Sequence, residues 1–442
     1  MALAVASARD PEGGPCFRVI GVDLDTDLGR QRIEQLNQGR FPFRTLDQEL
    51  TEAAVLARDT GNLRATSDPA SFAEADVILI DVNLDVEVDG PAPSVDLNGF
   101  REAVRSVGQR ISAGTLVVVE TTVPPGTCEY VVAPALREAL RKRGLAEDAF
   151  LLAHSYERVM PGREYLASIT NFWRAYSGYT DEAADACERF LSAVINVEAY
   201  PLTRLGSMTA SEAAKVMENS YRATNIAFID EWARFAEAVG IDLFEVVEAI
   251  RVRPTHANIR EPGFGVGGYC LTKDPLLPGI AARELFQNRE LTFPFSELAV
   301  ETNRKMPLAA ICRLEEMLGG LDGKRILLLG ISYRPDVGDT RHSPAESFVQ
   351  EARARGAEVV ARDPLVRHWS ELDLEIPGEL PSASSIDAAV FAVRHGTYQE
   401  LDLGAWLDGA SPAILDAGAV LTRVQRDRVK EAGCVFAAIG EG

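Results

Sequence analysis

The stretch Phe17-Arg-Val-Ile-Gly-Val-Asp23 has the apolar pattern of a buried β-strand that ends in an acidic residue, and residues 28–38 behind it have the spacing of an amphipathic helix. Further short apolar runs follow at residues 77–81, 116–120 and 149–153, with helix-like stretches between them. This alternation predicts a doubly wound α/β domain built on a parallel sheet.

The amino terminus departs from the usual form of such a domain. An acid such as Asp23, at the end of the second strand, commonly binds the adenosine ribose of NAD, and the first strand with its G-x-G-x-x-G loop lies about 20 residues earlier. Residues 1–8 are rich in alanine, which favours the helix after that loop over a degenerate first strand. We therefore expect the sequence to begin inside the domain, either because its start codon was assigned too late or because it is an NAD-deficient relative.

The rest of the chain contains a helical segment and a second α/β segment. Residues 211–239 have apolar positions at helical spacing, and Gly240 is placed to end that helix. Strand patterns return at residues 325–330, 358–361, 389–393 and 413–416. The predicted fold is α/β, with two Rossmann-like doubly wound domains joined by a helical middle domain, over residues 1–205, 206–300 and 301–442.

The composition argues against several classes of function. The 442 residues include 45 Lys and Arg against 66 Asp and Glu, a net charge of −21, which argues against a nucleic-acid partner. No apolar run reaches the roughly 20 residues of a membrane helix, so we expect no membrane span and a cytoplasmic location. The six cysteines occur singly, without a CxxC pair or a histidine cluster, which predicts neither a disulfide framework nor a metal site.

The loop Glu261-Pro-Gly-Phe-Gly-Val-Gly-Gly-Tyr-Cys-Leu-Thr-Lys-Asp-Pro275 carries the chemistry. Its glycines permit unusual backbone conformations and close approach of N–H groups to a ligand. Cys270 follows them, with Lys273 and Asp274 close by as a cation and a carboxylate. A thiol in such surroundings suits a nucleophile, and the alternative is a glycine-rich turn with a structural cysteine.

This loop closely resembles the cysteine signature of the nucleotide-sugar 6-dehydrogenases, with Tyr269 where that family has Ser or His. The resemblance runs in order from residues 19–23 to residues 338–341. It implies NAD-dependent oxidation of the C6 alcohol of a UDP-sugar to a carboxylate, in two hydride transfers. Cys270 would hold the intermediate aldehyde as a thiohemiacetal and then as a thioester.

Further catalytic roles follow from the same resemblance. Lys215 and Asn219 lie four residues apart on one helix face, where Lys215 would stabilise an oxyanion and Asn219 would share the hydrogen bond. Asp274 would handle the first proton, Thr122 would position a water, and Glu157 would activate water for thioester hydrolysis. His154 is interpreted as a structural side chain. The alternative for Thr122 is a turn that two prolines fix at the end of a strand.

The resemblance also implies binding residues and a partner. NAD would contact Asp23, Thr122, Lys273 and Arg341. The UDP-sugar would contact Glu157, Arg158, Lys215, Asn219, Arg251, Phe264, Gly265, Gly267, Gly268, Tyr333 and Arg334. Tyr333 would pack on the base, Arg334 would pair with the diphosphate, and Arg251 would reach the site of a second subunit in a homodimer formed through the central helices. The alternative for residues 330–341 is a charged loop at a helix entry.

The sequence indicates the substrate less clearly than it indicates the family. The loop and the segment Glu157-Arg-Val-Met-Pro-Gly162 slightly favour a UDP-N-acetylhexosamine, such as the ManNAc or GlcNAc sugar, over UDP-glucose. Tyr269 and residues 165–173 depart from both branches. A third alternative is a catalytically idle nucleotide-sugar-binding relative, although sugar nucleotide binding alone does not require a thiol.

Overall fold

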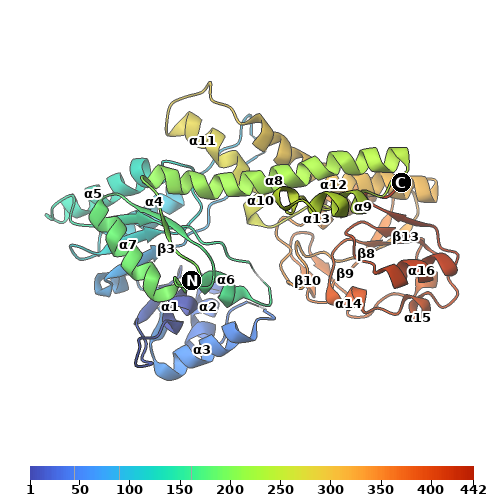
Figure 1. Cartoon of the computed structure of the whole chain (residues 1–442). Helices are drawn as coiled ribbons and strands as arrows, with labels where there is room; N and C mark the ends of the chain where they lie inside the picture. Colours follow the sequence, from blue (N-terminus) through green and yellow to red (C-terminus); the bar gives the residue numbers. More distant parts are fainter. Residues whose placement is uncertain (44, 89, 161) are drawn as a thin grey trace. The chain divides into compact units, whose positions relative to one another are not determined.

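The computed structural model describes all residues except 44, 89 and 161. The chain forms two compact units, the first from residues 1–218 and 276–292 and the second from residues 219–275 and 293–442. Both are α/β, as predicted, and Figure 1 labels most of their helices and some of their strands. The three domain boundaries expected from the sequence remain predictions.

The larger sheet of the first unit has the strand order β3-β4-β5-β6-β7, and β5 and β6 are its one antiparallel pair among the described residues. Its register aligns Ile78 with Val117 and Val117 with Leu152. The strands are β3 Val77–Ile80, β4 Leu116–Val119, β5 Leu151–His154, β6 Ala175–Gly178 and β7 Thr203–Arg204. The three apolar runs predicted as parallel strands are therefore confirmed.

Helices cover both faces of this sheet. Alternate side chains of β4 point to opposite faces, and both sets are apolar, so each face needs a covering layer. Val117 and Val119 pack with α4 (Asn98–Gly108) and α5 (Ala133–Lys142). Leu116 and Val118 pack with α7 (Asp181–Val194) and α1 (Ala2–Ser7). The doubly wound arrangement is thus present, and residues 1–8 form the predicted helix. Helix α11 (Leu277–Glu284) adds Leu277 and Ile280 to the core on the α4 side.

The remaining strands of the first unit form a separate parallel pair. Strand β1 (Val19–Val22) is hydrogen-bonded to β2 (Leu63–Thr66), and the pair packs with α2 (Asp27–Asn37), α3 (Gln48–Thr60) and α6 (Tyr165–Thr170). Among the described residues, no strand pairs with the other edge of β1 or with the edge of β3 away from β4. In a doubly wound dinucleotide-binding sheet, the first strand pairs with the strands on both sides of it, at the positions that β1 and β3 occupy here.

A long helix and several shorter ones form the central part of the chain. Helix α8 (Met208–Val239) begins in the first unit and ends in the second, where Gly240 terminates it at φ 78°, as predicted. In the second unit it is followed by α9 (Leu243–Arg251), α10 (Tyr269–Lys273) and α12 (Pro294–Leu318). Small side chains, namely Ala223, Ala227 and Ala299, bring α8 and α12 together.

The second unit also contains a five-stranded parallel sheet of order β14-β13-β12-β8-β9. Helices α12 and α13 (Pro344–Ala354) cover one face, and α14 (Gly396–Gln399), α15 (Leu403–Leu407) and α16 (Arg423–Glu431) cover the other. The strands are β8 Arg325–Leu329, β9 Glu358–Arg362, β12 Ala388–Phe391, β13 Ala413–Asp416 and β14 Phe436–Ala438, with a short antiparallel pair β10 His368–Trp369 and β11 Leu374–Glu375. Four of the five sheet strands were predicted, and β14 was missed.

Candidate active site

In the first unit, a buried carboxylate on α8 holds the loop that follows β4. Glu212 is 1% exposed, and its two oxygens accept hydrogen bonds from the backbone N–H groups of Gly126 (2.5 Å) and Cys128 (2.7 Å). Burial raises the pKa of Glu212 to about 7, although both backbone donors favour its ionised form. Glu212 was not predicted from the sequence. Its only signal is its place one helical turn before Lys215, on the same face.

Two adjacent threonines in this loop differ in what they bind. The Thr121 hydroxyl donates to the carbonyl of Val82 (3.0 Å) and accepts from its N–H (2.8 Å), so Thr121 ties the loop to the end of β3. Thr122 is half-buried and makes no side-chain hydrogen bond to the described residues. Its hydroxyl is therefore available to a water or a ligand, and the role predicted for it stays a prediction.

Lys215 and Glu157 lie together in the first unit. Lys215 is 6% exposed, and its Nζ donates to the backbone carbonyl of Glu157 at 2.8 Å and lies 5.6 Å from the centre of the Tyr156 ring. The carboxylate of Glu157 accepts from the N–H of Val159. The segment after β5 thus fixes the Lys215 ammonium in a mostly buried position, where a cation stabilises negative charge strongly.

Arg158 was predicted to bind substrate, but its guanidinium is hydrogen-bonded to groups of the first unit. Its guanidinium pairs with Glu218, donates to the Tyr156 hydroxyl at 3.0 Å and donates to the Trp173 carbonyl. Burial raises the pKa of Tyr156 to about 12, with a smaller contribution from the charge of Glu218. Pro161, the fifth residue of the quoted segment from Glu157 to Gly162, lies outside the described residues.

His154 lies at the end of β5 with no solvent exposure, and its Nδ1 contacts the hydroxyl of Ser211. Burial lowers the pKa of His154 to about 3, with a smaller contribution from the charge of Lys215, so the imidazole is neutral at neutral pH. A general base works best when its pKa lies near the working pH. The structure supports the structural interpretation of His154.

In the second unit, a buried carboxylate lies next to the cysteine loop. Asp274 is 1% exposed; Asn219 Nδ2 donates to its Oδ2 at 2.8 Å and Lys273 Nζ lies 2.9 Å from its Oδ1. Cys270 is exposed in α10, four residues before Asp274. The structure therefore brings Asn219, Lys273 and Asp274 together, and Asn219 lies one helical turn beyond Lys215 on α8.

The glycines of the cysteine loop are approached by the segment of residues 333–342. A Cβ on Gly267 would lie 2.3 Å from the carbonyl oxygen of His342, and one on Gly268 would lie 2.9 Å from the Tyr333 ring. The N–H of Gly268 donates to the carbonyl of Arg341 at 3.1 Å. Gly267 thus allows a close approach that any side chain would block, and Gly268 adopts φ 77°. The groups that approach the two glycines belong to the same chain: a backbone carbonyl at Gly267 and the ring of Tyr333 at Gly268.

Asn303, which the sequence analysis did not identify, fixes the same loop from α12. Its side-chain amide donates to the carbonyl of Val266 (2.6 Å) and accepts from the N–H of Val266 (2.8 Å). Arg341 pairs with Asp339, and its guanidinium lies 4.6 Å from the centre of the Tyr269 ring. The hydrogen bond with Asp339 is the main reason that the pKa of Arg341 is raised.

The other predicted binding residues have varied surroundings. The ring of Phe264 packs on Phe348 in the core, so only its backbone is open to a ligand. Arg251 donates to the carbonyl of Ile259 and pairs with Glu261. Tyr333, whose pKa burial raises to about 12, lies against Gly268. Arg334 has no guanidinium partner among the described residues, and Gly265 adopts φ 100° beside Asn303.

The carboxyl end of β1 fits the adenosine half of NAD. The carboxylate of Asp23 accepts from the N–H of Leu24 at 2.8 Å and lies 3.8 Å from Arg32, which leaves lone pairs for ribose hydroxyls. Gly13 and Gly14 follow α1 in the turn before β1, and not at the amino end of a helix where a pyrophosphate is bound. The residues present thus fit the ribose, and we assign no contact to the pyrophosphate.

The described residues contain no group of three His, Cys, Asp or Glu side chains placed to hold a metal ion. In the same part of the chain, no helix has both the length and the apolar character needed to cross a membrane.

The fold and the cysteine loop define an NAD-dependent oxidoreductase of nucleotide sugars. The chain belongs to the UDP-glucose/GDP-mannose dehydrogenase family. The models of that family match the NAD binding domain over residues 13–191, the central domain over residues 209–305 and the UDP binding domain over residues 327–423. The resemblance found in the sequence is confirmed, and the chain carries the domains for NAD and for UDP.

Individual relatives agree with this membership. The chain is 31% identical over 436 residues to the UDP-N-acetyl-D-mannosamine dehydrogenase of Pyrococcus horikoshii, covering 96% of this chain and 94% of the relative. A solved structure described as UDP-D-ManNAc dehydrogenase from the same organism superposes with a TM-score of 0.82 at 26% identity, covering 99% and 96% of the two chains. A UDP-glucose dehydrogenase from Pyrobaculum islandicum has a TM-score of 0.81 at 25% identity, covering 100% and 94%.

Replacing Glu212 by Gln should change how stability depends on pH. The folded pKa of about 7 lies above the ordinary glutamate value of 4.5, so only the folded state holds this proton between those two pH values. The contribution of Glu212 to the free energy of unfolding is therefore present at low pH and is lost as the pH rises toward 7. The loss is at most about 1.4 kcal/mol per pH unit. Glu212→Gln should remove that decline. Urea denaturation between pH 5 and 8 measures this change, and Glu52→Gln, at an exposed glutamate of α3, is the control. Parallel plots of stability against pH for wild type and Glu212→Gln would refute the assignment.

Proposed function

We propose that the protein oxidises the C6 alcohol of a UDP-sugar to the carboxylate, with Cys270 as the nucleophile. The observation that supports this proposal is the exposed Cys270 in a loop whose neighbouring carboxylate, Asp274, is buried and held by Asn219 and Lys273. A surface turn with a structural cysteine has no need of a buried, doubly bound carboxylate four residues away.

The reaction removes four electrons. Bound NAD supplies the hydride acceptor, and two NAD molecules are reduced to NADH for each sugar. After the first oxidation the Cys270 thiolate adds to the C6 aldehyde and forms a thiohemiacetal, which retains the aldehyde in the protein. Loss of a second hydride gives a thioester on Cys270. Water then attacks the thioester carbonyl, the carbon–sulfur bond breaks, and the thiol and the uronate are released.

The neighbouring groups would hold charge and protons during these steps. We assign to Lys215 the stabilisation of the alkoxide and of the thiohemiacetal oxygen, with Asn219 sharing that hydrogen bond. Asp274 would take the first proton, either directly or through a water that Thr122 positions. Glu157 would activate the water that hydrolyses the thioester. The mostly buried position of Lys215 supports its role, because a fixed ammonium stabilises an oxyanion most strongly away from bulk water.

Binding roles are proposed on the same basis. Asp23 would accept hydrogen bonds from the ribose of NAD, and Lys273 and Arg341 are the remaining candidates for NAD beside Thr122. Arg334 would pair with the diphosphate, and Tyr333 would pack on the uracil base. Gly265, Gly267, Gly268 and the backbone of Phe264 would border the sugar.

The preferred substrate is a UDP-N-acetylhexosamine, with UDP-glucose as the alternative. Relatives named for UDP-N-acetyl-D-mannosamine support the first, and the structural neighbour named for UDP-glucose keeps the second open. The ratio of kcat/KM for UDP-N-acetylmannosamine, UDP-N-acetylglucosamine and UDP-glucose tests this preference. We expect an acetylated sugar to exceed UDP-glucose by at least about tenfold, or 1.4 kcal/mol in transition-state binding. A ratio in favour of UDP-glucose would assign the chain to the alternative.

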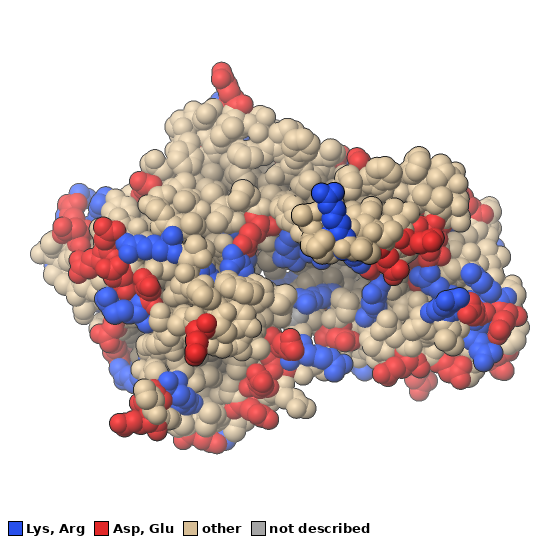
Figure 2. Space-filling view, in the orientation of Figure 1, with Lys and Arg blue, Asp and Glu red and all other residues tan. Residues whose placement is uncertain are grey.

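An exposed apolar stripe in the second unit supports a homodimer through the central helices. It is formed by Phe228, Trp232 and Phe235 of α8, each about half exposed. On α12, which packs against α8 through Ala299, Phe295 is 78% exposed and Leu298 is also exposed. The three aromatic rings contact one another in sequence. Figure 2 shows a largely uncharged surface over the carboxyl-terminal part of α8, in contrast to the interspersed acidic and basic side chains elsewhere on that face. Contiguous apolar patches of this kind mark protein interfaces.

A dimer of this kind would let Arg251 approach the partner's substrate, which remains a proposal. We also propose a cytoplasmic location. None of the six cysteines forms a disulfide in the described chain, and disulfides are rare in the reducing cytosol.

Cys270→Ser should lower steady NADH production from a UDP-sugar by well over tenfold, because a serine hydroxyl is too weakly acidic to trap the aldehyde. Calorimetric binding of UDP should stay unchanged. Cys312→Ser, at an exposed cysteine of α12, serves as the control and should keep wild-type turnover. Turnover of Cys270→Ser within tenfold of wild type, a loss below about 1.4 kcal/mol, would remove Cys270 from the mechanism and favour the idle relative.

Trp232→Glu should weaken self-association by at least about tenfold, because a carboxylate would be desolvated within the apolar stripe. Size-exclusion chromatography with light scattering, over a range of protein concentrations, measures the change. Val424→Glu is the matched control, since Val424 is an exposed apolar residue of α16 in the same unit, outside the stripe. A wild-type monomer at all concentrations, or equal effects of the two substitutions, would refute the proposed interface.

A further inference from the structure

The parallel sheet of the second unit changes direction of winding between β8 and β12. From β8 the chain continues to β9 on one side, and from β12 it continues to β13 on the other. Ligands of open α/β sheets bind beyond the carboxyl ends of the strands at such a point. Two segments emerge there, residues 330–336 after β8 and residues 392–396 after β12. The first carries Arg334, our candidate for the diphosphate.

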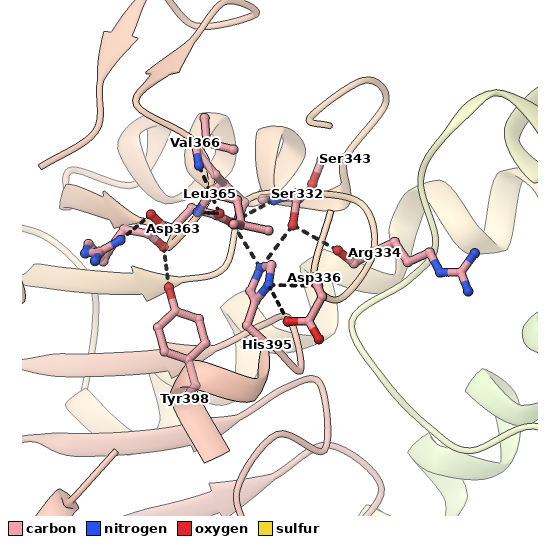
Figure 3. A network of polar contacts seen from close by, with 12 residues as sticks. Ser332, Arg334, Asp336, Ser343, Asp363, Leu365, Val366, His395 and Tyr398 are labelled. Atoms are coloured by element: carbon pink, nitrogen blue, oxygen red, sulfur yellow. Dashed lines mark hydrogen bonds and ion pairs between the residues drawn. The ribbon is translucent and has the colours of Figure 1, made fainter. Parts of the chain in front are cut away.

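A fully buried histidine joins these two segments. His395 Nε2 lies 3.1 Å from Asp363 Oδ2 and 3.0 Å from Ser332 Oγ, and its Nδ1 accepts the backbone N–H of Asp336 at 3.0 Å. His395 and Asp363 have no solvent exposure. Figure 3 shows the imidazole between Asp363 on one side and Asp336 on the other, with the Arg334 side chain extending away from this network.

The hydrogen-bond donors define the state of the imidazole. A backbone N–H can only donate, so Nδ1 must present its lone pair to Asp336. Nε2 therefore carries the hydrogen that Asp363 accepts. Asp363 also accepts from the N–H groups of Ile331 (3.0 Å) and Ser332 (3.2 Å). Burial acts to raise the pKa of Asp363, but His395 and the N–H groups of Ile331 and Leu365 outweigh it, and the pKa is lowered.

This arrangement excludes a serine-nucleophile triad, although Ser332, His395 and Asp363 are the residue types of one. Such a triad needs the serine hydroxyl to donate to a histidine nitrogen that is itself without hydrogen. Here the Ser332 hydroxyl donates to the carbonyl of Arg334 at 3.0 Å, and Nε2 is protonated toward Asp363. The network acts on the backbone on both sides of Arg334.

The backbone that the network holds includes an uncommon conformation. Asp336 has φ 56°, which non-glycine residues adopt rarely and at a free-energy cost. Its N–H is bound by His395, and one of its carboxylate oxygens accepts from the N–H of Gly396 at 3.2 Å. The turn after Arg334 is thus fixed from the β12 side at two points, while Ser332 and Asp363 fix the chain before it.

We propose that His395 is a positioning residue for substrate: together with Asp363 it holds residues 331–336 so that Arg334 presents its guanidinium to the diphosphate of the nucleotide. His395 contacts no substrate itself and acts through Arg334. The inference rests on the proposed function in that it takes the bound group to be a nucleoside diphosphate.

Calorimetric titration with UDP, which requires no turnover, tests this on the full chain. His395→Leu should weaken UDP binding by at least about tenfold and raise KM for the UDP-sugar similarly, while kcat changes by less than about threefold, since the diphosphate binds equally in ground and transition states. His395→Gln should recover most of the affinity, because its amide can accept from Asp336 and donate to Asp363. Tyr398→Phe is the control: it removes a hydrogen bond to the Arg362 carbonyl next to the network and should leave UDP affinity unchanged.

A double-substitution cycle separates positioning from general support of the fold. If His395 acts through Arg334, then His395→Leu combined with Arg334→Ala should be hardly weaker than Arg334→Ala alone. Full additivity, or UDP affinity of His395→Leu within twofold of wild type, would overturn the proposal. Should His395→Leu not fold, Ser332→Ala decides, with several-fold weaker UDP binding expected and unchanged binding contradicting it. A wild-type protein that binds UDP but oxidises no UDP-sugar would contradict the proposed function and leave the result of this cycle standing.

Discussion

The spacing of three polar residues along α8 is the constraint on which the candidate site depends. Glu212, Lys215 and Asn219 lie three and four residues apart, so the hydrogen-bonded helix puts them on one face. Each is almost fully buried, and each holds a different segment: the loop after β4, the segment after β5 and the carboxylate of Asp274. A shift of one residue in the helix would remove all three contacts together.

Buried side chains with several hydrogen bonds stabilise the loops around the proposed chemistry. Glu212, Asn303 and Asp363 each bind backbone groups of a loop distant in sequence. A buried polar group left without partners costs about 1–3 kcal/mol, so each loop is locked in the one conformation that satisfies its partner. The glycine-containing segments of residues 263–268 and 330–341 thereby have defined shapes before any ligand binds. Preorganisation of this kind is what a site for a charged intermediate requires.

The elements with a strongly periodic apolar pattern, and the cysteine loop with its reactive residues, could be predicted from the sequence. The strands at residues 116–120 and 325–330, the long helix ending at Gly240 and the cysteine loop were all identified, because each depends on local pattern. Strand β14 was missed, since three residues at Phe436–Ala438 give no alternation to recognise. Glu212 and His395 were also missed: their partners lie 86 and 59 residues away in the chain, and burial at that distance leaves no local signal. Likewise, the approach of Tyr333 to Gly268 depends on how two loops pack.

The covalent role of Cys270 is the central claim, and a single-turnover reaction tests it most directly. Enzyme in excess over UDP-N-acetylmannosamine, with saturating NAD, would be quenched in acid at successive times and analysed by mass spectrometry of its peptides, with NADH measured in parallel. The account predicts two NADH per uronate and a transient uronyl thioester on the peptide that contains Cys270. One NADH per sugar with free aldehyde released, or an adduct on any other residue, would contradict it.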